Sequence, residues 1–108
     1  MVVAIFRTRV RPEVIDEYQA ELTRIRKIAA EQPGFLGAKK YYGDDGDALS
    51  IQEWESLDHL KAWRDHPEHA AVRRRGREEF YQDFTVYICD EPRKYDFFRE
   101  ESAAIDGN

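Results

Sequence analysis

Residues 35–55 read FLGAKKYYGDDGDALSIQEWE, two strand-like runs on either side of a polar turn. The runs at 35–42 and 48–55 carry the aromatic and alternating apolar residues expected of strands. The sequence GDDGD at 43–47 supplies the glycine and aspartate residues that tight turns favour. This stretch predicts an antiparallel hairpin in the middle of the chain, and the fold class follows from what flanks it.

The segment before the hairpin predicts a strand and then a helix. Residues 2–10, VVAIFRTRV, are mostly β-branched or aromatic, and Pro12 follows at a position suited to a first helical turn. From Pro12 to Ala30 the apolar residues recur at spacings of three and four, which places them on one helical face: Val14, Ile15, Tyr18, Leu22, Ile25 and Ala29. Pro33 and Gly34 then separate this helix from the hairpin.

The segment after the hairpin predicts a helix interrupted by a proline, and then a fourth strand. Ser56 occupies an N-cap position before a short helix at 57–64. Because the residue before a proline is disfavoured in helical geometry, we expect a restart at Pro67 and a second helix to residue 80. Residues 84–90, FTVYICD, predict the last strand. A polar tail at 93–108 carries an aromatic cluster: Tyr95, Phe97 and Phe98.

The predicted order β-α-β-β-α-β is that of the ferredoxin-like α+β fold, a four-stranded antiparallel sheet with its helices on one face. We expect one domain at 1–92, because 108 residues suffice for a single core. The strands offer apolar residues on both sides, so the face without helices is left uncovered. We expect a second copy of the chain to cover it in a homodimer.

Composition excludes several classes of protein. The 17 Lys and Arg against 22 Asp and Glu give a net charge of −5, which argues against a dedicated nucleic-acid partner. No apolar run approaches the length of a membrane span, and Arg7 and Arg9 interrupt the apolar start before a signal peptide can form. The single cysteine, Cys89, forms no intrachain disulfide and fits a reducing compartment. We therefore expect a cytoplasmic protein with no membrane partner.

Residues 51–69 read IQEWESLDHLKAWRDHPEH, a strand that ends in Glu and Trp, a short helix with Trp, and a His-Pro-x-His restart. This segment resembles the antibiotic biosynthesis monooxygenase (ABM) family, as do the R-P pair at 11–12 and P-G-F at 33–35. The resemblance covers residues 2–90. It implies a dimeric α+β barrel with a pocket in each subunit between sheet and helices. Relatives include oxygenases of quinols or polycyclic phenols, haem-degrading enzymes and isomerases of small sugar-like signals.

The activity that the resemblance implies is monooxygenation of a small electron-rich aromatic, of quinol or phenol type, with no metal and no cofactor. The deprotonated substrate passes an electron to O2, and the protein orients the ring and stabilises the anion. The alternative is a non-catalytic ligand-binding or stress-associated dimer on the same scaffold. Haem binding is less favoured, because arginines occupy 73–75, about where that branch has its iron-ligating histidine. The pocket asparagine of several oxygenase branches is also missing, since the only asparagine is Asn108.

The candidate catalytic residues are Trp63 and His69. Trp63 lies on the apolar stripe of the short helix, where it either packs as core or forms a wall of the pocket. His69 lies on the inward stripe of the second helix, where an imidazole accepts a phenolic proton near neutral pH. With no third ligand nearby, the histidines do not indicate a metal site.

The candidate substrate-binding residues each have a structural alternative. His66 either reaches the substrate or caps the second helix, and Trp54 lines either the pocket or the dimer face. Arg7 binds a substrate anion, reaches solvent, or pairs with Glu53 on the adjacent strand. Arg73 either faces the pocket or belongs to a solvated helix face, where neighbouring arginines meet glutamates four residues later.

Overall fold

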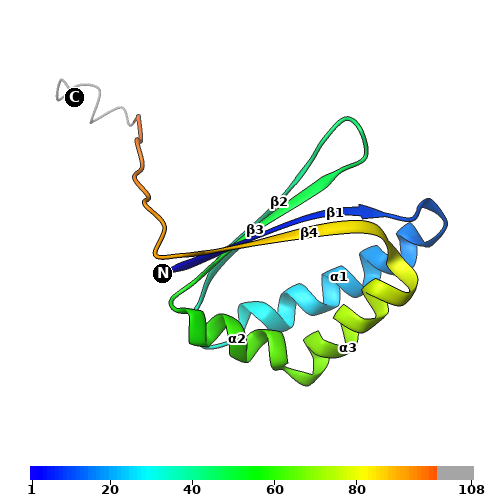
Figure 1. The fold of residues 1–108 in the computed structure, drawn as a ribbon, viewed down its shortest axis with the longest axis horizontal. Coiled ribbons are helices and arrows are strands. Elements are labelled where there is room, and N and C mark those ends of the chain that lie inside the picture. The colour runs from blue at the N-terminus through cyan, green and yellow to red at the C-terminus, as the bar shows by residue number, and fades with distance from the viewer. Residues whose placement is uncertain (100–108) are drawn as a thin grey trace.

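Four strands form one antiparallel sheet in the computed structural model, which describes residues 1–99 (Figure 1). The order across the sheet is β2-β3-β1-β4, and the strands span Val2–Val10 (β1), Phe35–Tyr42 (β2), Ala48–Trp54 (β3) and Tyr81–Asp90 (β4). The central strand β1 pairs with β3 and β4, so Ile5 lies between Ile51 and Tyr87. The predicted hairpin is confirmed as β2 and β3.

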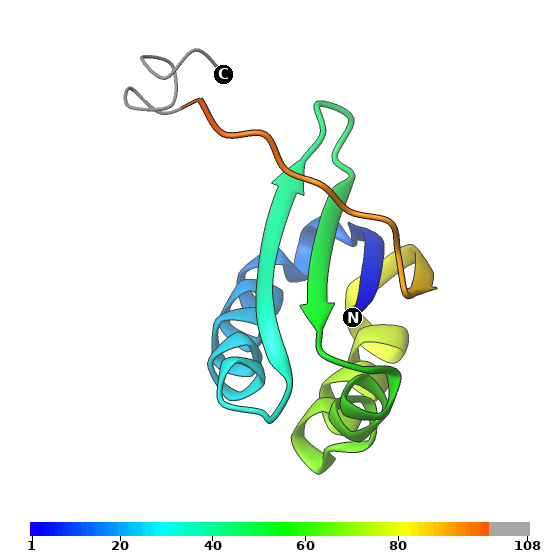
Figure 2. The ribbon, with the colours of Figure 1, turned by 90° about the vertical axis from the view of Figure 1, so that its left-hand side faces the viewer.

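The helices all lie on one face of the sheet (Figures 1 and 2). They are a 3-10 turn at Pro12–Val14, α1 at Ile15–Ala30, α2 at Leu57–Asp65, α3 at Pro67–Arg75 and a π-helical turn at Gly76–Phe80. Strands and helices together make the ferredoxin-like α+β fold, and this prediction is confirmed. None of the helices within residues 1–99 combines the length and apolar character needed to cross a membrane.

Ser56 and Pro67 set the starts of α2 and α3. The hydroxyl of Ser56 accepts a hydrogen bond from the backbone N–H of His59 at 3.2 Å, as an N-cap does. His66, which precedes the proline, has a ψ of 131° and lies outside helical geometry. The chain therefore turns between the two helices, and the residues before and after this turn face the same space.

The last strand begins at Tyr81 rather than at Phe84, where the sequence predicts it. The regular pairing of β1 with β4 ends at Arg9 and Asp83, and the register then shifts, so that Val10 pairs with Tyr81. This additional pair extends β4 toward its N-terminal end. The helix before it ends in a π-helical turn that begins at Gly76. A Cβ at this position would collide with the ring of Tyr81, so the glycine permits their close approach.

Alternation along the strands gives the sheet an inner face toward the helices and an outer face away from them. The inner face carries, from β1 and β3, Ala4, Phe6, Thr8, Ser50, Gln52 and Trp54. The outer face carries the residues between them: Val3, Ile5, Arg7, Leu49, Ile51 and Glu53.

The core lies at one end of the inner face, where Val2 pairs with Trp54 and both are fully buried. Ile25 and Ala29 of α1 and Trp63 of α2 complete this cluster. Toward Thr8, at the other end of the inner face, a second group of aromatic side chains packs edge to face: Phe6, Tyr18, Phe80, Tyr81 and Phe84.

Candidate active site

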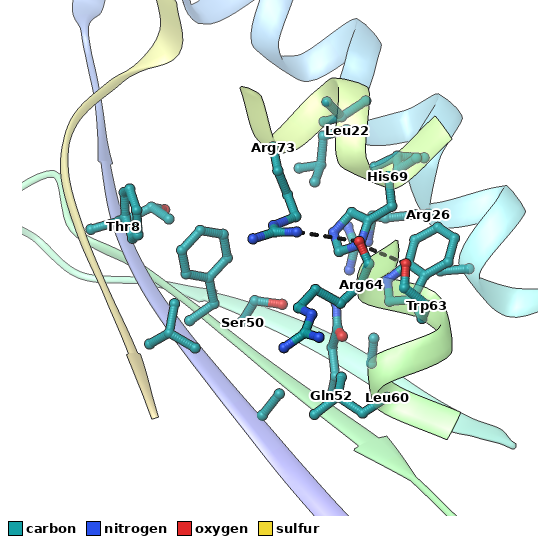
Figure 3. Close-up of a pocket in the computed structure, with 18 of the residues that line it drawn as sticks. Thr8, Leu22, Arg26, Ser50, Gln52, Leu60, Trp63, Arg64, His69 and Arg73 are labelled. Carbon is teal, nitrogen blue, oxygen red and sulfur yellow. Dashed lines mark hydrogen bonds between the residues drawn. The ribbon is translucent and has the colours of Figure 1, made fainter. Parts of the chain in front are cut away.

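A cavity of about 550 Å³ lies between the inner face of the sheet and the helices (Figure 3). The sheet contributes Ala4, Phe6, Thr8, Ser50, Gln52, Phe84, Val86 and Ile88 to its lining. The helices contribute apolar side chains from α1, α2 and α3, among them Leu22, Ile25, Leu60, Trp63 and Val72. The volume falls in the range of small-molecule sites and suits a compound of two or three fused rings.

The cavity reaches the surface beside β4. Val86 and Ile88 pair with Phe6 and Ala4 and so belong to the inner face, yet they are 48% and 50% exposed. β4 is an edge strand, and the helix layer does not cover its inner side chains. A ligand therefore has an apolar way in along this edge.

Three aromatic rings form a row that ends at the cavity. The indoles of Trp54 and Trp63 have centroids 6.2 Å apart, and the imidazole of His69 lies 4.4 Å from that of Trp63 with an interplanar angle of 8°. Trp63 and His69 line the cavity, whereas Trp54 does not. Trp54 is fully buried, and its Nε1 donates to Gln52 Oε1 at 3.2 Å, so it supports Trp63 from the core rather than contacting a ligand.

The hydrogen bond of His69 assigns its tautomer. Nδ1 lies 3.1 Å from the backbone carbonyl oxygen of Trp63, and because a carbonyl only accepts, Nδ1 carries the proton and donates it. The Nε2 atom, with its free lone pair, has no protein partner in the described part of the chain. His69 therefore offers a ligand a hydrogen-bond acceptor.

Burial lowers the pKa of His69 to about 4, and the positive charge of Arg73 acts in the same direction. The imidazole is therefore neutral at pH 7. The sequence predicts a base that titrates near neutrality, and the buried His69 is a weaker base than that. A simple phenol has a pKa of about 10, so proton transfer to His69 faces a gap of about 8 kcal/mol. Transfer therefore requires groups that stabilise the substrate anion or a hydroxyl that is already acidic.

Trp63 holds an unused donor. Its side chain is 3% exposed, and Nε1 is the only fully buried side-chain nitrogen or oxygen within residues 1–99 that lacks a hydrogen-bond partner. An unpaired buried donor costs about 1–3 kcal/mol. Because Nε1 itself is fully buried, a ligand oxygen reaches this donor only when the side chains around it move.

The other predicted binding residues separate into one at the cavity and two away from it. Arg73 lines the cavity, and its guanidinium points into it, held by a hydrogen bond from Nη1 to the carbonyl oxygen of Arg64 at 3.2 Å (Figure 3). His66 does not line it, because its Nδ1 accepts the backbone N–H of Glu68 at 3.1 Å and caps α3. Its structural alternative is the one observed.

Arg7 lies on the outer face, on the far side of the sheet from the cavity. It pairs with Asp83 at 2.8 Å and with Asp47 at 3.3 Å, and not with Glu53, which pairs with Lys94 at 3.4 Å. The predicted contact of Arg7 with a substrate therefore has no counterpart in the cavity lining, because odd-numbered residues of β1 face away from the helices.

Some lining residues escaped the sequence analysis. Thr8, Ser50 and Gln52 place polar groups on the sheet side of the cavity. Ser50 and Gln52 alternate with the apolar residues Leu49 and Ile51 along β3, and this strand pattern predicts that they lie on the opposite face from those two. Several cationic residues at the helix side also went unnoticed, because charged residues on a helix normally face solvent: Arg26, Lys61, Arg64 and Arg77. Within the described residues, no group of three His, Cys, Asp or Glu side chains is placed to hold a metal ion.

Comparison with known proteins agrees with this architecture. The model of the antibiotic biosynthesis monooxygenase family matches residues 1–75. The uncharacterized protein YqjZ of Bacillus subtilis is 33% identical over 86 residues, which cover 80% of this chain and 75% of YqjZ.

Two solved structures share the fold at low sequence identity. Rv0793 from Mycobacterium tuberculosis superposes with a TM-score of 0.77 at 19% identity, over 88% of this chain and 98% of that one. SnoaB, a cofactor-independent oxygenase from Streptomyces nogalater, superposes with a TM-score of 0.72 at 17% identity, over 86% of this chain and 94% of that one. On the family match and the fold together, the chain belongs to the antibiotic biosynthesis monooxygenase family.

Proposed function

We propose that the cavity is the active site of a cofactor-independent monooxygenase that acts on a small electron-rich aromatic, of quinol or phenol type. The observation that carries this proposal is the neutral imidazole of His69, whose Nε2 is left for a ligand at an apolar cavity of about 550 Å³. Family membership supports the reaction class, and the unpaired Nε1 of Trp63 supports an oxygen-bearing ligand.

The reaction can be written for an anthrone-type substrate, whose enol form carries a phenolic hydroxyl. His69 Nε2 accepts the hydroxyl proton, and the resulting anion transfers one electron to O2. The substrate radical and superoxide combine, forming a C–O bond at the ring carbon opposite the oxygen, and His69 returns its proton to give a hydroperoxide. The O–O bond then breaks as the carbon loses its hydrogen, so a CH2 group and O2 become a carbonyl and water.

The weak basicity of His69 assigns a second task to its neighbours. The N–H of Trp63 and the positive charge of the cationic side chains that line the cavity stabilise the substrate anion, which reduces the energetic gap for the first proton transfer. Because Nε1 of Trp63 is buried, this donor acts more strongly than it would in water. The residues of the chain thus bind, orient and deprotonate the substrate.

Oxygen consumption with a panel of quinols and anthrones tests this proposal. His69→Asn keeps a donor for the Trp63 carbonyl but lacks Nε2, so we expect kcat/KM to fall at least about a hundredfold. His69→Gln places an amide near the position of Nε2 that accepts a hydrogen bond but not a proton, so its kcat/KM should fall as well. His66→Asn is the matched control, because asparagine preserves the helix cap outside the cavity. Absence of uptake with every compound, or equal rates in all three variants, would contradict an oxygenase.

Ligand binding without turnover is the second candidate function, and the low pKa of His69 is the observation that favours it. Quenching of tryptophan fluorescence by the same compounds, without oxygen uptake, would assign this role. Trp63 is the reporter, because it lines the cavity.

We also propose that the protein is a homodimer in which the outer face of the sheet is buried. Val3, Ile5, Leu49 and Ile51 form an apolar stripe there, flanked by Tyr41 and Tyr87, which are 47% and 57% exposed. Light scattering after size-exclusion chromatography should give twice the 12.8 kDa of one chain. Ile5→Asp should give the monomer mass, and a monomeric parent protein would contradict the proposal.

A further inference from the structure

The cavity lining has the opposite charge to the rest of the chain. Glu21 is its one acidic residue, whereas six lining residues are cationic: Arg26, Lys40, Lys61, Arg64, Arg73 and Arg77. The whole sequence has 17 Lys and Arg against 22 Asp and Glu. The arrangement therefore concentrates positive charge at one site of an acidic protein.

Most of these cations have no acidic partner. Arg64 pairs with Asp65 at 3.2 Å, but the other five have no carboxylate within 4.0 Å among residues 1–99. Glu21 does not compensate them, because Arg24 occupies it at 3.2 Å. On the outer face, by contrast, Arg7 and Arg9 both pair with aspartates.

Arg73 is placed to bind an anion. Its bond to the Arg64 carbonyl uses one N–H of the guanidinium and leaves the remaining donors for a ligand. Arg77 follows one helical turn later and lies over the ring of Phe84 at 5.4 Å, on the side where the cavity opens along β4. Both side chains are exposed to solvent, so salt screens their attraction for an anion.

We propose that the ligand of this cavity is an aromatic compound that carries a fixed anionic group, in the simplest case a carboxylate, bound by Arg73 with Arg77 beside it. This inference names the substrate class of the site and rests on the function proposed above. The rings occupy the apolar part of the cavity, and the carboxylate accepts two parallel hydrogen bonds from the guanidinium of Arg73. Arg73 is then the residue that selects anionic over neutral aromatics.

Binding under nitrogen tests the inference apart from turnover. The probes are 1-hydroxy-2-naphthoate, which is anionic, and 1-naphthol, which is neutral at pH 7, with affinities measured by calorimetry. We expect the naphthoate to bind about tenfold more tightly or better, and this preference to weaken as salt is raised. Equal affinity for both probes would overturn the inference, whatever the oxygen assays show.

Variants of neighbouring arginines locate the effect. Arg73→Gln should abolish the preference for the naphthoate and leave the affinity for 1-naphthol within twofold, while Arg73→Lys should retain part of the preference. Arg74→Gln is the matched control, because Arg74 is exposed on the same helix and does not line the cavity. If Arg74→Gln lowers the preference as much as Arg73→Gln does, general surface charge is responsible and the assignment to Arg73 is overturned.

Discussion

The imidazole of His69 lies parallel to the indole of Trp63, 4.4 Å away, and donates its Nδ1 proton to the backbone carbonyl of that same residue. One neighbour thus desolvates the ring and also fixes its tautomer. The behaviour of the cavity with pH, ligand and mutation depends on this pair.

Stability should fall in mild acid because of His69. Its pKa is about 4 in the folded protein and near 6.5 when unfolded, so above pH 6.5 neither state carries the proton. Between pH 6.5 and 4 His69 is protonated in the unfolded state but still neutral in the folded state. This difference lowers the free energy of unfolding by at most about 3 kcal/mol.

Urea denaturation of the parent protein and of His69→Asn at several pH values measures this contribution. The variant has no titrating group at position 69, so its free energy of unfolding should decline less between pH 6.5 and 4. Parallel declines in both proteins would show that His69 titrates normally.

The two tryptophans should respond differently to replacement by phenylalanine. Trp63→Phe removes the unpaired Nε1 that faces no protein acceptor, so the affinity for 1-naphthol should fall about fivefold or more, the loss of a hydrogen bond. Trp54→Phe removes a donor that already binds Gln52 and does not line the cavity, so it should lower stability with little effect on affinity. Calorimetry and urea denaturation together separate the two effects, and equal losses of affinity would contradict the placement of Trp63.

Gly34 should tolerate alanine less well than Gly46. Both have positive φ, at 82° and 89°, so both substitutions strain the backbone by about 1 kcal/mol. A Cβ on Gly34 would also collide with the side chain of His59, whereas a Cβ on Gly46 meets open space. We expect Gly34→Ala to lose about 2 kcal/mol more than Gly46→Ala in denaturant unfolding, and similar losses would mean that the contact with His59 relaxes freely.

Arg7→Gln should leave the cavity unaffected. The side chain of Arg7 is on the outer face, bound to Asp47 and Asp83, so ligand affinity should stay within twofold of the parent protein. The fraction of dimer should fall instead, because the substitution leaves Asp83 without its arginine partner on the proposed interface, while Asp47 keeps Arg9 at 2.8 Å. A loss of naphthoate affinity equal to that of Arg73→Gln would place Arg7 at the cavity.

Local patterns in the sequence predict the elements well. The turn at 43–47, the cap at Ser56 and the break at Pro67 all act within a few residues, and the structure confirms each. The period of α1 likewise gives its buried face, with Tyr18 and Ile25 among the covered residues.

The site is harder to predict because it depends on contacts between distant segments. The partners of Arg7 come from the hairpin turn and from β4, which no local spacing indicates. Trp54 and Trp63 are equally aromatic, and only the position of the core decides which of them meets the cavity. The pKa of His69 follows from burial against a ring, which a sequence pattern does not quantify.

The helix break at Pro67 also governs the chemistry of the cavity. In an unbroken helix the Trp63 carbonyl would accept the N–H of residue 67, but proline has none, and the oxygen instead receives the N–H of His66 and the Nδ1 proton of His69, each at 3.1 Å. The missing amide thus selects which imidazole nitrogen remains free. A residue with no reactive group of its own decides the protonation pattern that a bound molecule encounters.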